Sequence, residues 1–312
     1  MVLDAQSLEN LMSKKILIIS DKRAGHENQS IAFCNILNYE FEILHVKYKY
    51  KFFKIFSYIF DFLNIYTDKL FVCEEKLLSQ DYEYILTCGS STYYAGKYFS
   101  KKTGSKLIAL MYPKGFKNNF YHIFASFHDE PKQSDNLTIL PINISYLVPK
   151  NIYSPKRKAV GIVIGGDNAS FKINKNRIEK ELLSIKEQFV DYEIAITSSP
   201  RTSKEVEGII EKMNFDYEVI YSKNKINPIS DFLYKCEYVF LTDDSTSMIS
   251  EAVCSGRAFV EIIRLNTNMK VSKYSLFVEN IVHLKAAHFY NGRVGKNNKK
   301  IDLKDTIQKA LK

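Results

Sequence analysis

Several features that would assign this chain of 312 residues quickly are missing from it. No uninterrupted apolar run reaches the roughly 18 residues that a membrane-spanning helix needs. The five cysteines are scattered and form no CxxC pair, which argues against a zinc site or a disulfide framework and is typical of buried thiols in a reducing compartment. The N-terminus has no apolar segment ahead of a cleavage site, so we expect no signal peptide.

The common catalytic signatures are absent as well. The sequence contains no GxGxxG, no P-loop, no HExxH, no GxSxG and no DxD motif. Chemistry based on a nicotinamide, a P-loop, a zincin site or a hydrolase nucleophile elbow therefore loses its usual support. We expect no metal ion and no cofactor.

The composition, in contrast, is that of a globular protein. Hydrophobic residues make up 46% and charged residues 25% of the chain, which excludes a disordered or fibrous protein. The net charge of +9 suits an anionic partner, such as a phosphorylated ligand, a membrane surface or nucleic acid. No nucleic-acid reader motif is recognisable, so we expect no nucleic-acid partner.

Short β-branched runs alternate with helical patterns along the chain, which is typical of parallel α/β architecture. In the first half we predict strands at 16–20, 41–46, 84–88, 106–111 and 122–126. The stretch 146–157 contains two prolines and three basic residues without periodicity, which indicates a linker. The prediction is an N-terminal extension at 1–13, a Rossmann-like domain at 14–150 and a second one at 151–312.

A second alternating series follows the linker. We predict strands at 159–166, 192–198, 217–221, 238–242 and 258–263, separated by helices near 174–188, 203–213, 228–235 and 245–255. The fold class is therefore α/β, with two doubly wound sheets facing a central cleft. Ligands of such folds usually bind beyond the carboxyl ends of the strands.

Three loops of the second half begin where a predicted strand ends: 165–170, 198–203 and 243–247. Each offers small residues, hydroxyl groups or free backbone N–H groups, which can hold phosphate at a helix N-terminus. Together they predict one pocket for a phosphorylated ligand, formed by Gly165, Gly166, Asn168, Ser199, Arg201, Thr202, Asp244, Ser245, Thr246 and Ser247.

Glu251 lies about one helical turn beyond the last of these loops, where a carboxylate can accept hydrogen bonds from two ribose hydroxyls. The alternative for the loop 243–247 is an ordinary helix cap, and the alternative for Glu251 is a solvated surface side chain.

The loop after the first strand, 20–30, concentrates polar residues around Gly25. His26 is the best candidate for a general base because the ordinary pKa of histidine lies near neutrality. Glu27 and, at the end of another strand, Asp129 are further candidates. The alternative is that this loop only caps the following helix.

The stretch 47–66 places Phe52, Ile55, Phe56, Ile59, Leu63 and Tyr66 on one helical stripe and gathers four lysines at its start. A basic, aromatic, amphipathic helix can lie on an anionic membrane surface. A core helix of the first domain explains the same stripe equally well.

The segments SDKRAGHENQS (20–30), CGSST (88–92), GIVIGGDNASFK (161–172), ITSSPRTS (196–203) and LTDDSTSMISEAVCSGRAFV (241–260) resemble, in order and spacing, the "elongated mitochondria" family of mitochondrial fission. Bacterial members of that family are named as nucleoside-diphosphate-sugar epimerase-like. The resemblance runs from about Lys15 to the C-terminus, and the chain differs from the family pattern at Asp167 to Ser170.

The resemblance implies a GT-B type fold, with an acceptor bound by the N-terminal domain and a nucleotide-sugar donor bound by the C-terminal one. Glu251 then matches a ribose-binding acid, Ser245 to Ser247 a phosphate-binding turn, and Arg201 a diphosphate-neutralising cation. The expected function is a glycosyltransferase that uses a lipid-linked or envelope saccharide acceptor, with the protein cytoplasmic and peripheral to the inner membrane face. A nucleotide-sugar 2-epimerase and a non-catalytic division scaffold are the alternatives.

Overall fold

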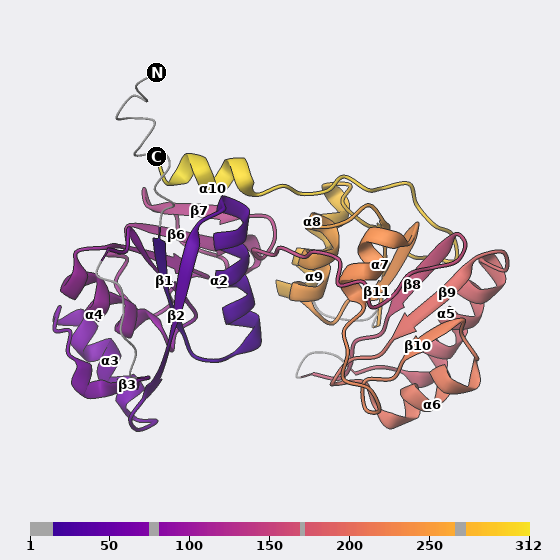
Figure 1. The fold of residues 1–312 in the computed structure, drawn as a ribbon, viewed down its shortest axis with the longest axis horizontal. Coiled ribbons are helices and arrows are strands. Elements are labelled where there is room, and N and C mark those ends of the chain that lie inside the picture. Colours follow the sequence, from indigo (N-terminus) through magenta and orange to yellow (C-terminus); the bar gives the residue numbers. More distant parts are fainter. Residues whose placement is uncertain (1–14, 75–80, 169–171, 266–272) are drawn as a thin grey trace, which may run out of the picture. The chain divides into compact units, whose positions relative to one another are not determined.

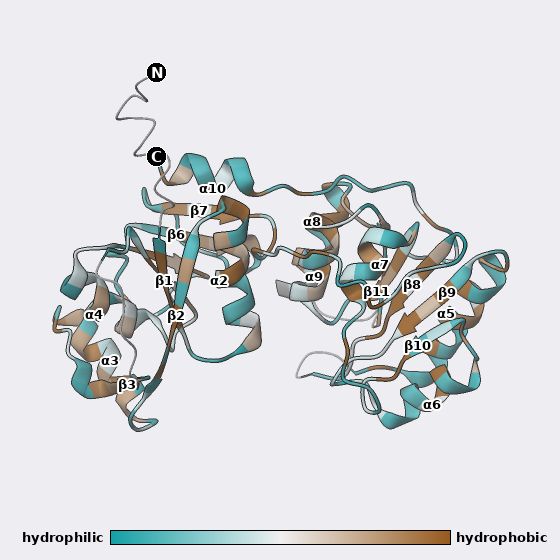
Figure 2. Cartoon of the chain, viewed as in Figure 1, coloured by the Kyte–Doolittle hydropathy of each residue, from teal (hydrophilic) through white to brown (hydrophobic). Residues whose placement is uncertain are grey.

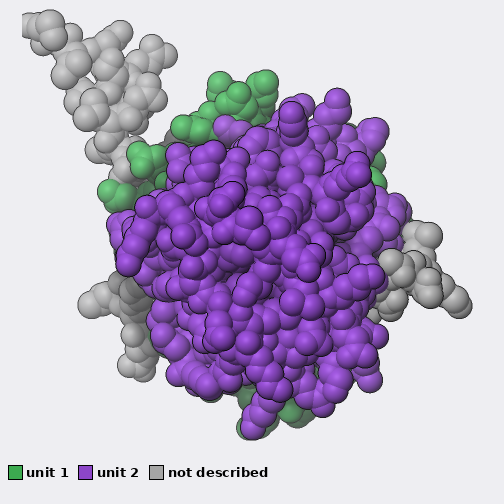
Figure 3. Space-filling model, turned by 90° about the vertical axis from the view of Figure 1, so that its right-hand side faces the viewer, with its two compact units in different colours: residues 1–146, 303–312 green, residues 147–302 purple. Residues whose placement is uncertain are grey.

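The computed structural model describes residues 15–74, 81–168, 172–265 and 273–312. The chain divides into two compact units (Figure 1; Figure 3). Unit 1 comprises Met1–Tyr146 with Leu303–Lys312, and unit 2 comprises Leu147–Asp302. The predicted extension at 1–13 lies outside the described residues.

Unit 1 is built around a seven-stranded sheet with the order β3-β2-β1-β4-β5-β6-β7. All neighbouring strands are parallel except β2 and β3. Its elements are β1 Lys15–Ser20, α2 Ala24–Leu37, β2 Glu40–Tyr48, α3 Phe53–Phe62, the 3-10 turn η1 Asp68–Leu70, β3 Phe71–Cys73, β4 Tyr84–Cys88, α4 Tyr93–Thr103, β5 Lys106–Leu110, β6 His122–Ser126, the 3-10 turn η2 Phe127–Asp129, β7 Leu137–Leu140 and α10 Lys304–Ala310.

Helices cover both faces of this sheet. The strands are rich in hydrophobic residues (Figure 2) because a parallel sheet is buried on both sides. Alternate residues of β1 therefore serve different cores: Leu17 and Ile19 belong to the cluster that includes Tyr93 and Phe99 of α4. Helix α2 lies on the other side of the sheet from α3 and α4 (Figure 1).

Unit 2 is built around a six-stranded, all-parallel sheet with the order β10-β9-β8-β11-β12-β13. Its elements are β8 Ala159–Val163, α5 Lys175–Gln188, β9 Glu193–Thr197, α6 Lys204–Lys212, β10 Tyr217–Val219, α7 Ile229–Lys235, β11 Tyr238–Thr242, α8 Thr246–Cys254, β12 Phe259–Ile263, α9 Lys273–His283 and β13 His288–Phe289. The predicted strands and helices of this half are confirmed, and their observed ends lie within a few residues of the predicted ends. Helix caps match the sequence: the side chains of Asn174, Ser203 and Ser245 accept from the first turns of α5, α6 and α8.

Each sheet has one point where the strand order reverses. In unit 1 the chain runs from β1 to β2 on one side and later places β4 on the other side of β1. In unit 2 it runs from β8 to β9 and later places β11 on the other side of β8. Loops that leave two neighbouring strands in opposite directions open a crevice, and ligands of doubly wound folds bind there. The fold therefore indicates two places for ligand sites: the carboxyl ends of β1 and β4, and the carboxyl ends of β8 and β11.

Two predictions of extent need correction. The predicted second domain, 151–312, included the C-terminal helix, but Leu303–Lys312 belong to unit 1, where α10 contacts α2. The amphipathic helix expected within the stretch 47–66 is shorter, Phe53–Phe62, because Asn64 adopts a left-handed conformation with φ of 57° shortly after its last turn. In the described part of the chain, no helix combines the length and the apolar character needed to cross a bilayer.

Candidate functional sites in the two units

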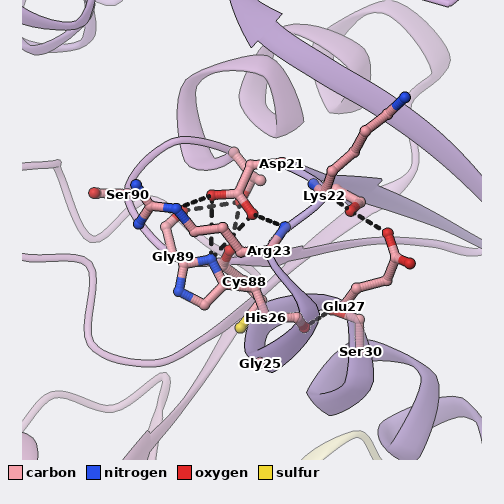
Figure 4. A network of polar contacts seen from close by, with 12 residues as sticks. Asp21, Lys22, Arg23, Gly25, His26, Glu27, Ser30, Cys88, Gly89 and Ser90 are labelled. Atoms are coloured by element: carbon pink, nitrogen blue, oxygen red, sulfur yellow. Dashed lines mark hydrogen bonds and ion pairs between the residues drawn. The ribbon is translucent and has the colours of Figure 1, made fainter. Parts of the chain in front are cut away.

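At the carboxyl ends of β1 and β4 in unit 1, Asp21 and His26 form a carboxylate–imidazole pair (Figure 4). Nδ1 of His26 lies 3.2 Å from both carboxylate oxygens of Asp21, whose side chain is almost fully buried. Asp21 also accepts from the backbone N–H of Arg23, which fixes the loop that leads into α2. The described residues place no hydrogen-bond partner on Nε2 of His26, so this nitrogen can face a substrate.

The loop after β4 supplies a wall for the imidazole ring. Gly89 has a positive φ of 84°, and a Cβ built on it would lie 2.4 Å from Cε1 of His26. Only glycine combines this backbone conformation with this close approach. The ring of His26 is thus held between Asp21 and the Gly89 backbone, as Figure 4 shows.

Glu27, the second predicted acid–base residue, is engaged in a different network. Its Oε2 accepts from Ser20 Oγ at 2.5 Å and lies 3.1 Å from Nε2 of His45. The other ring nitrogen of His45 lies 2.9 Å from Glu74, which also pairs with Lys22 at 2.6 Å. Glu27 is therefore less available than His26 to accept a proton from a substrate.

Asp129, the third predicted residue, ends the turn η2 after β6. Its charge and that of Asp21 both act on Cys88 at the end of β4: burial is the main cause that raises the pKa of this thiol, and the two carboxylates raise it further. Asp21 and Asp129 therefore both lie within electrostatic range of this strand end, although they are 108 residues apart in the sequence.

At the carboxyl ends of β8 and β11 in unit 2, Asp244 lies at the centre of a network of hydrogen bonds. Its side chain is fully buried and accepts from the backbone N–H of Gly166 at 3.1 Å and from Oγ1 of Thr242 at 2.6 Å. Thr242 in turn accepts from the N–H of Gly165 at 2.8 Å. These bonds join the loop after β8 to the loop after β11. Asp244 was predicted as a ligand contact, and in the structure its side chain holds these two loops together.

The third loop joins the same network through Arg201. Its Nη2 lies 2.8 Å from Oδ2 of Asp244, and its side chain remains 41% exposed. A Cβ on Gly166 would lie 2.1 Å from the carbonyl of Arg201, so the two loops are in backbone contact. Oγ1 of Thr202 donates to the carbonyl of Gly165 and bonds Ser199, which fixes the turn. A guanidinium has five N–H donors, so the bond to Asp244 leaves others for an anion.

Helix α8 begins at this network. Ser245 is its N-cap and accepts from the N–H of Met248 at 3.3 Å. The first turn of a helix presents further N–H groups and the positive end of the dipole. Here that turn opens into a pocket of about 310 Å³ lined by Asn168, Arg201, Asp244, Ser245, Thr246, Ser247 and Tyr274. The pocket combines a cation with oriented donors and therefore suits an anion.

Glu251 lies on the same helix, four residues after Ser247 and so on the same face. Its carboxylate has no hydrogen-bond partner among the described residues. Burial raises the pKa of Glu251 to about 7, and the positive charge of Lys150 lowers it only in part. A half-buried carboxyl group next to an anion pocket, shifted by burial and without a partner, is typical of a functional position.

The structure thus gathers the predicted residues of unit 2 into one place, with six of them lining the pocket and Gly165, Gly166, Ser199 and Thr202 holding its loops. Sequence reasoning missed Asp21, His45 and Tyr274. Asp21 follows a strand end beside the glycine loop and could have been found. His45 could not, because only the sheet register pairs it with Ser20. Among the described residues, no three His, Cys, Asp or Glu side chains are grouped to hold a metal ion.

Two sequence comparisons, with protein families and with single proteins, each match most of the chain. The family described as Mitochondrial fission ELM1 matches residues 24–312. Uncharacterized protein RP120 from Rickettsia prowazekii (strain Madrid E) is 24% identical over 323 residues, which cover 88% of this chain and 90% of that protein.

Among solved structures, a co-structure of MnaA with UDP from S. aureus covers 96% of this chain and 88% of its own, at 14% identity and a TM-score of 0.48. A UDP-GlcNAc 2-epimerase from Neisseria meningitidis bound to UDP-GlcNAc covers 96% of this chain and 100% of its own, at 13% identity and a TM-score of 0.45. A family 9 glycosyl transferase from Veillonella parvula covers 95% of this chain and 96% of its own, at 11% identity and a TM-score of 0.44.

Proposed function

The chain belongs to the mitochondrial fission ELM1 family, and from that premise we propose that it is a glycosyltransferase. It moves a sugar from a nucleotide-activated donor to a lipid-linked or cell-envelope saccharide at the cytoplasmic face of the membrane. The observation that carries the proposal is the pocket at the start of α8, with Arg201 and the helix N-terminus on its wall and Glu251 one turn further along.

The chemistry of the donor explains this arrangement. A nucleoside diphosphate has two charged phosphates next to a ribose with two neighbouring hydroxyl groups. The diphosphate fits the N-terminus of α8 and Arg201, and the ribose hydroxyls fit the carboxylate of Glu251. A helix cap alone explains Ser245, but it explains neither the exposed guanidinium nor the unpartnered acid.

Unit 1 supplies the base. In the proposed reaction Nε2 of His26 takes the proton of an acceptor hydroxyl as its oxygen bonds to the anomeric carbon of the donor sugar. The bond from that carbon to the diphosphate breaks, and the nucleoside diphosphate leaves. Asp21 holds the imidazole through Nδ1 and stabilises the imidazolium that forms.

The acceptor class rests on residues 47–66, which we propose contact an anionic membrane. The exposed apolar residues of this stretch and its lysines support a membrane-bound acceptor. A soluble 2-epimerase would need no such surface.

Calorimetric titration of UDP, GDP, dTDP, ADP and CMP into the whole chain tests the donor site. We expect one nucleoside diphosphate to bind and Glu251→Gln to weaken its binding roughly ten- to a hundredfold, because hydrogen bonds to a charged group contribute about 1.5–3 kcal/mol. Glu187→Gln, an exposed acid on α5, is the matched control and should bind as the wild type does. Absence of binding by all five nucleotides would favour a non-catalytic scaffold.

The pH dependence of stability separates lost contacts from a damaged fold. The pKa of Glu251 is raised to about 7 in the folded chain, so the folded state holds the proton more tightly than the unfolded state between about pH 4.3 and 7. Stability therefore falls as the pH rises through that window, by up to about 3 kcal/mol. Glu251→Gln should unfold at a higher temperature than the wild type near pH 8 and at a similar one near pH 4. A variant that is more stable and binds less tightly has lost a ligand contact.

A further inference from the structure

Helix α3 of unit 1 packs Phe53, Tyr58 and Phe60 against the core and buries its polar residues, yet leaves several large apolar residues exposed. Ser57 and Asp61 are fully buried, at 0% and 1% exposure, whereas Ile55 and Phe62 are 65% and 72% exposed. The exposed apolar residues of this region form what we call the α3 face: Tyr50, Phe52, Ile55, Phe56, Ile59, Phe62, Leu63 and Ile65. Large apolar side chains gathered in this way on one exposed helix and its flanks are typical of an interaction site.

The orientation of α3 is fixed by its buried side. One oxygen of Asp61 accepts from Nζ of Lys97 at 2.6 Å and from the hydroxyl of Tyr66 at 2.9 Å, and the other accepts from the backbone N–H of Lys117 at 2.7 Å. Ser57 bonds the hydroxyl of Tyr48 at 2.9 Å. Turning the apolar side inward would break these buried bonds, so the α3 face stays exposed.

The charged residues of the stretch 47–66 have one sign, apart from a single buried acid. Asp61 is the only acidic residue between positions 47 and 66, and it is buried against Lys97. The same stretch contains Lys47, Lys49, Lys51 and Lys54, and Nζ of Lys117 lies 5.3 Å from the ring centre of Phe62. An exposed apolar surface on a stretch that also carries four lysines and no exposed acid matches an anionic lipid surface, which offers hydrocarbon and phosphate together.

A second copy of the chain matches this surface less well. Two α3 faces packed together would bring two sets of these lysines close without an acidic residue from either stretch to neutralise them. Like charges placed against each other at an interface oppose association. The charge pattern therefore favours a bilayer over a dimer.

Helix α3 is also bonded to the candidate site of its own unit. Nζ of Lys54 lies 2.8 Å from Oγ of Ser90, in the loop after β4. The residue before Ser90 is Gly89, whose backbone lies against the ring of His26. The α3 face and the proposed base are thus attached to one loop.

We propose that the α3 face inserts into the interface of an anionic bilayer and that unit 1 thereby takes an acceptor that is itself anchored in the membrane. The second half of this inference rests on the proposed glycosyltransferase function; the first half does not. Membrane binding and nucleotide binding are measured separately, so failure of one is distinguishable from failure of the other.

Flotation of the whole chain with vesicles tests the docking. We expect binding to vesicles of phosphatidylcholine mixed with phosphatidylglycerol and much weaker binding to phosphatidylcholine alone. Each lysine near an anionic surface contributes about fivefold in affinity, so Gln at positions 47, 49, 51 and 54 together should weaken binding at least about a hundredfold. Ile55→Glu with Ile59→Glu should abolish it. Both residues are exposed, so this variant is expected to fold.

The controls are matched in unit 2. Leu183→Glu with Val190→Glu changes two residues that are 48% and 72% exposed, and Lys180, Lys204, Lys212 and Lys225 to Gln removes four exposed lysines. Both controls should bind vesicles as the wild type does, and all variants should bind nucleotide equally. Equal flotation of the wild type and the Ile55/Ile59 variant would overturn the proposal. A wild-type dimer that this variant dissociates in the absence of lipid would overturn it in favour of a second copy.

Discussion

At the scale of single residues, the hydrogen bond that Asp21 accepts decides which nitrogen of His26 can take a proton. A carboxylate accepts from Nδ1–H, which leaves the lone pair on Nε2. An amide in the same place can also donate to Nδ1 and so stabilise the other form of the ring. In the proposed reaction Asp21 is thus a positioning residue that acts through His26.

Asp21→Asn should therefore lower kcat by about ten- to a hundredfold or more and leave nucleotide affinity unchanged, because the proposed donor site lies in unit 2. Nitrogen NMR of the His26 ring should show the proton on Nδ1 in the wild type and a different distribution in the variant. Asp135→Asn, an exposed residue of the same unit, should change neither. An altered His26 ring with turnover unchanged would mean that another group is the base.

At the scale of elements, periodicity identified which residues of α3 share a face but not the direction in which that face points. The stripe containing Ile55 and Ile59 was compatible with a core helix and with a membrane helix. The structure decides for exposure through Asp61, whose partner Lys97 comes from α4, 36 positions away. A long-range ion pair of this kind leaves no local pattern in a sequence.

The same pair predicts a large effect on stability. Burial lowers the pKa of Lys97 and the charge of Asp61 opposes that shift, so each partner is needed by the other. Asp61→Ala leaves a buried ammonium unpaired and should lower the free energy of unfolding by about 3–5 kcal/mol in a urea titration. Adding Lys97→Met should restore part of the loss. Asp135→Ala is the exposed control; a loss for Asp61→Ala as small as the one measured for this control would contradict the account.

At the scale of the whole molecule, the sequence predicted the two mainly parallel sheets because their central strands are continuous apolar runs. It missed β3, β7 and β13, which are short and lie at or near sheet edges, where a strand needs less apolar surface. The site in unit 2 was predictable because strand ends in one parallel sheet meet at one edge, so three loops far apart in sequence had to converge. The network around Glu27 was not, because the pairing of β1 with β2 brings His45 to Glu27 and the pairing of β2 with β3 brings Glu74 to His45.

Convergence within one sheet leads to a prediction about the division of labour in the chain. Every residue that lines the pocket at α8, as well as Glu251 and Lys150, lies within Leu147–Asp302. That unit has its own sheet and hydrophobic core, so the fragment 147–302 should fold alone. We expect it to bind the preferred nucleotide within about threefold of the whole chain, a difference below 1 kcal/mol. Calorimetry on the fragment, with circular dichroism to establish folding and Glu251→Gln in the fragment as the control, measures this. A folded fragment that no longer binds would show that unit 1 contributes to holding the donor, and the assignment of the nucleotide to unit 2 alone would be wrong.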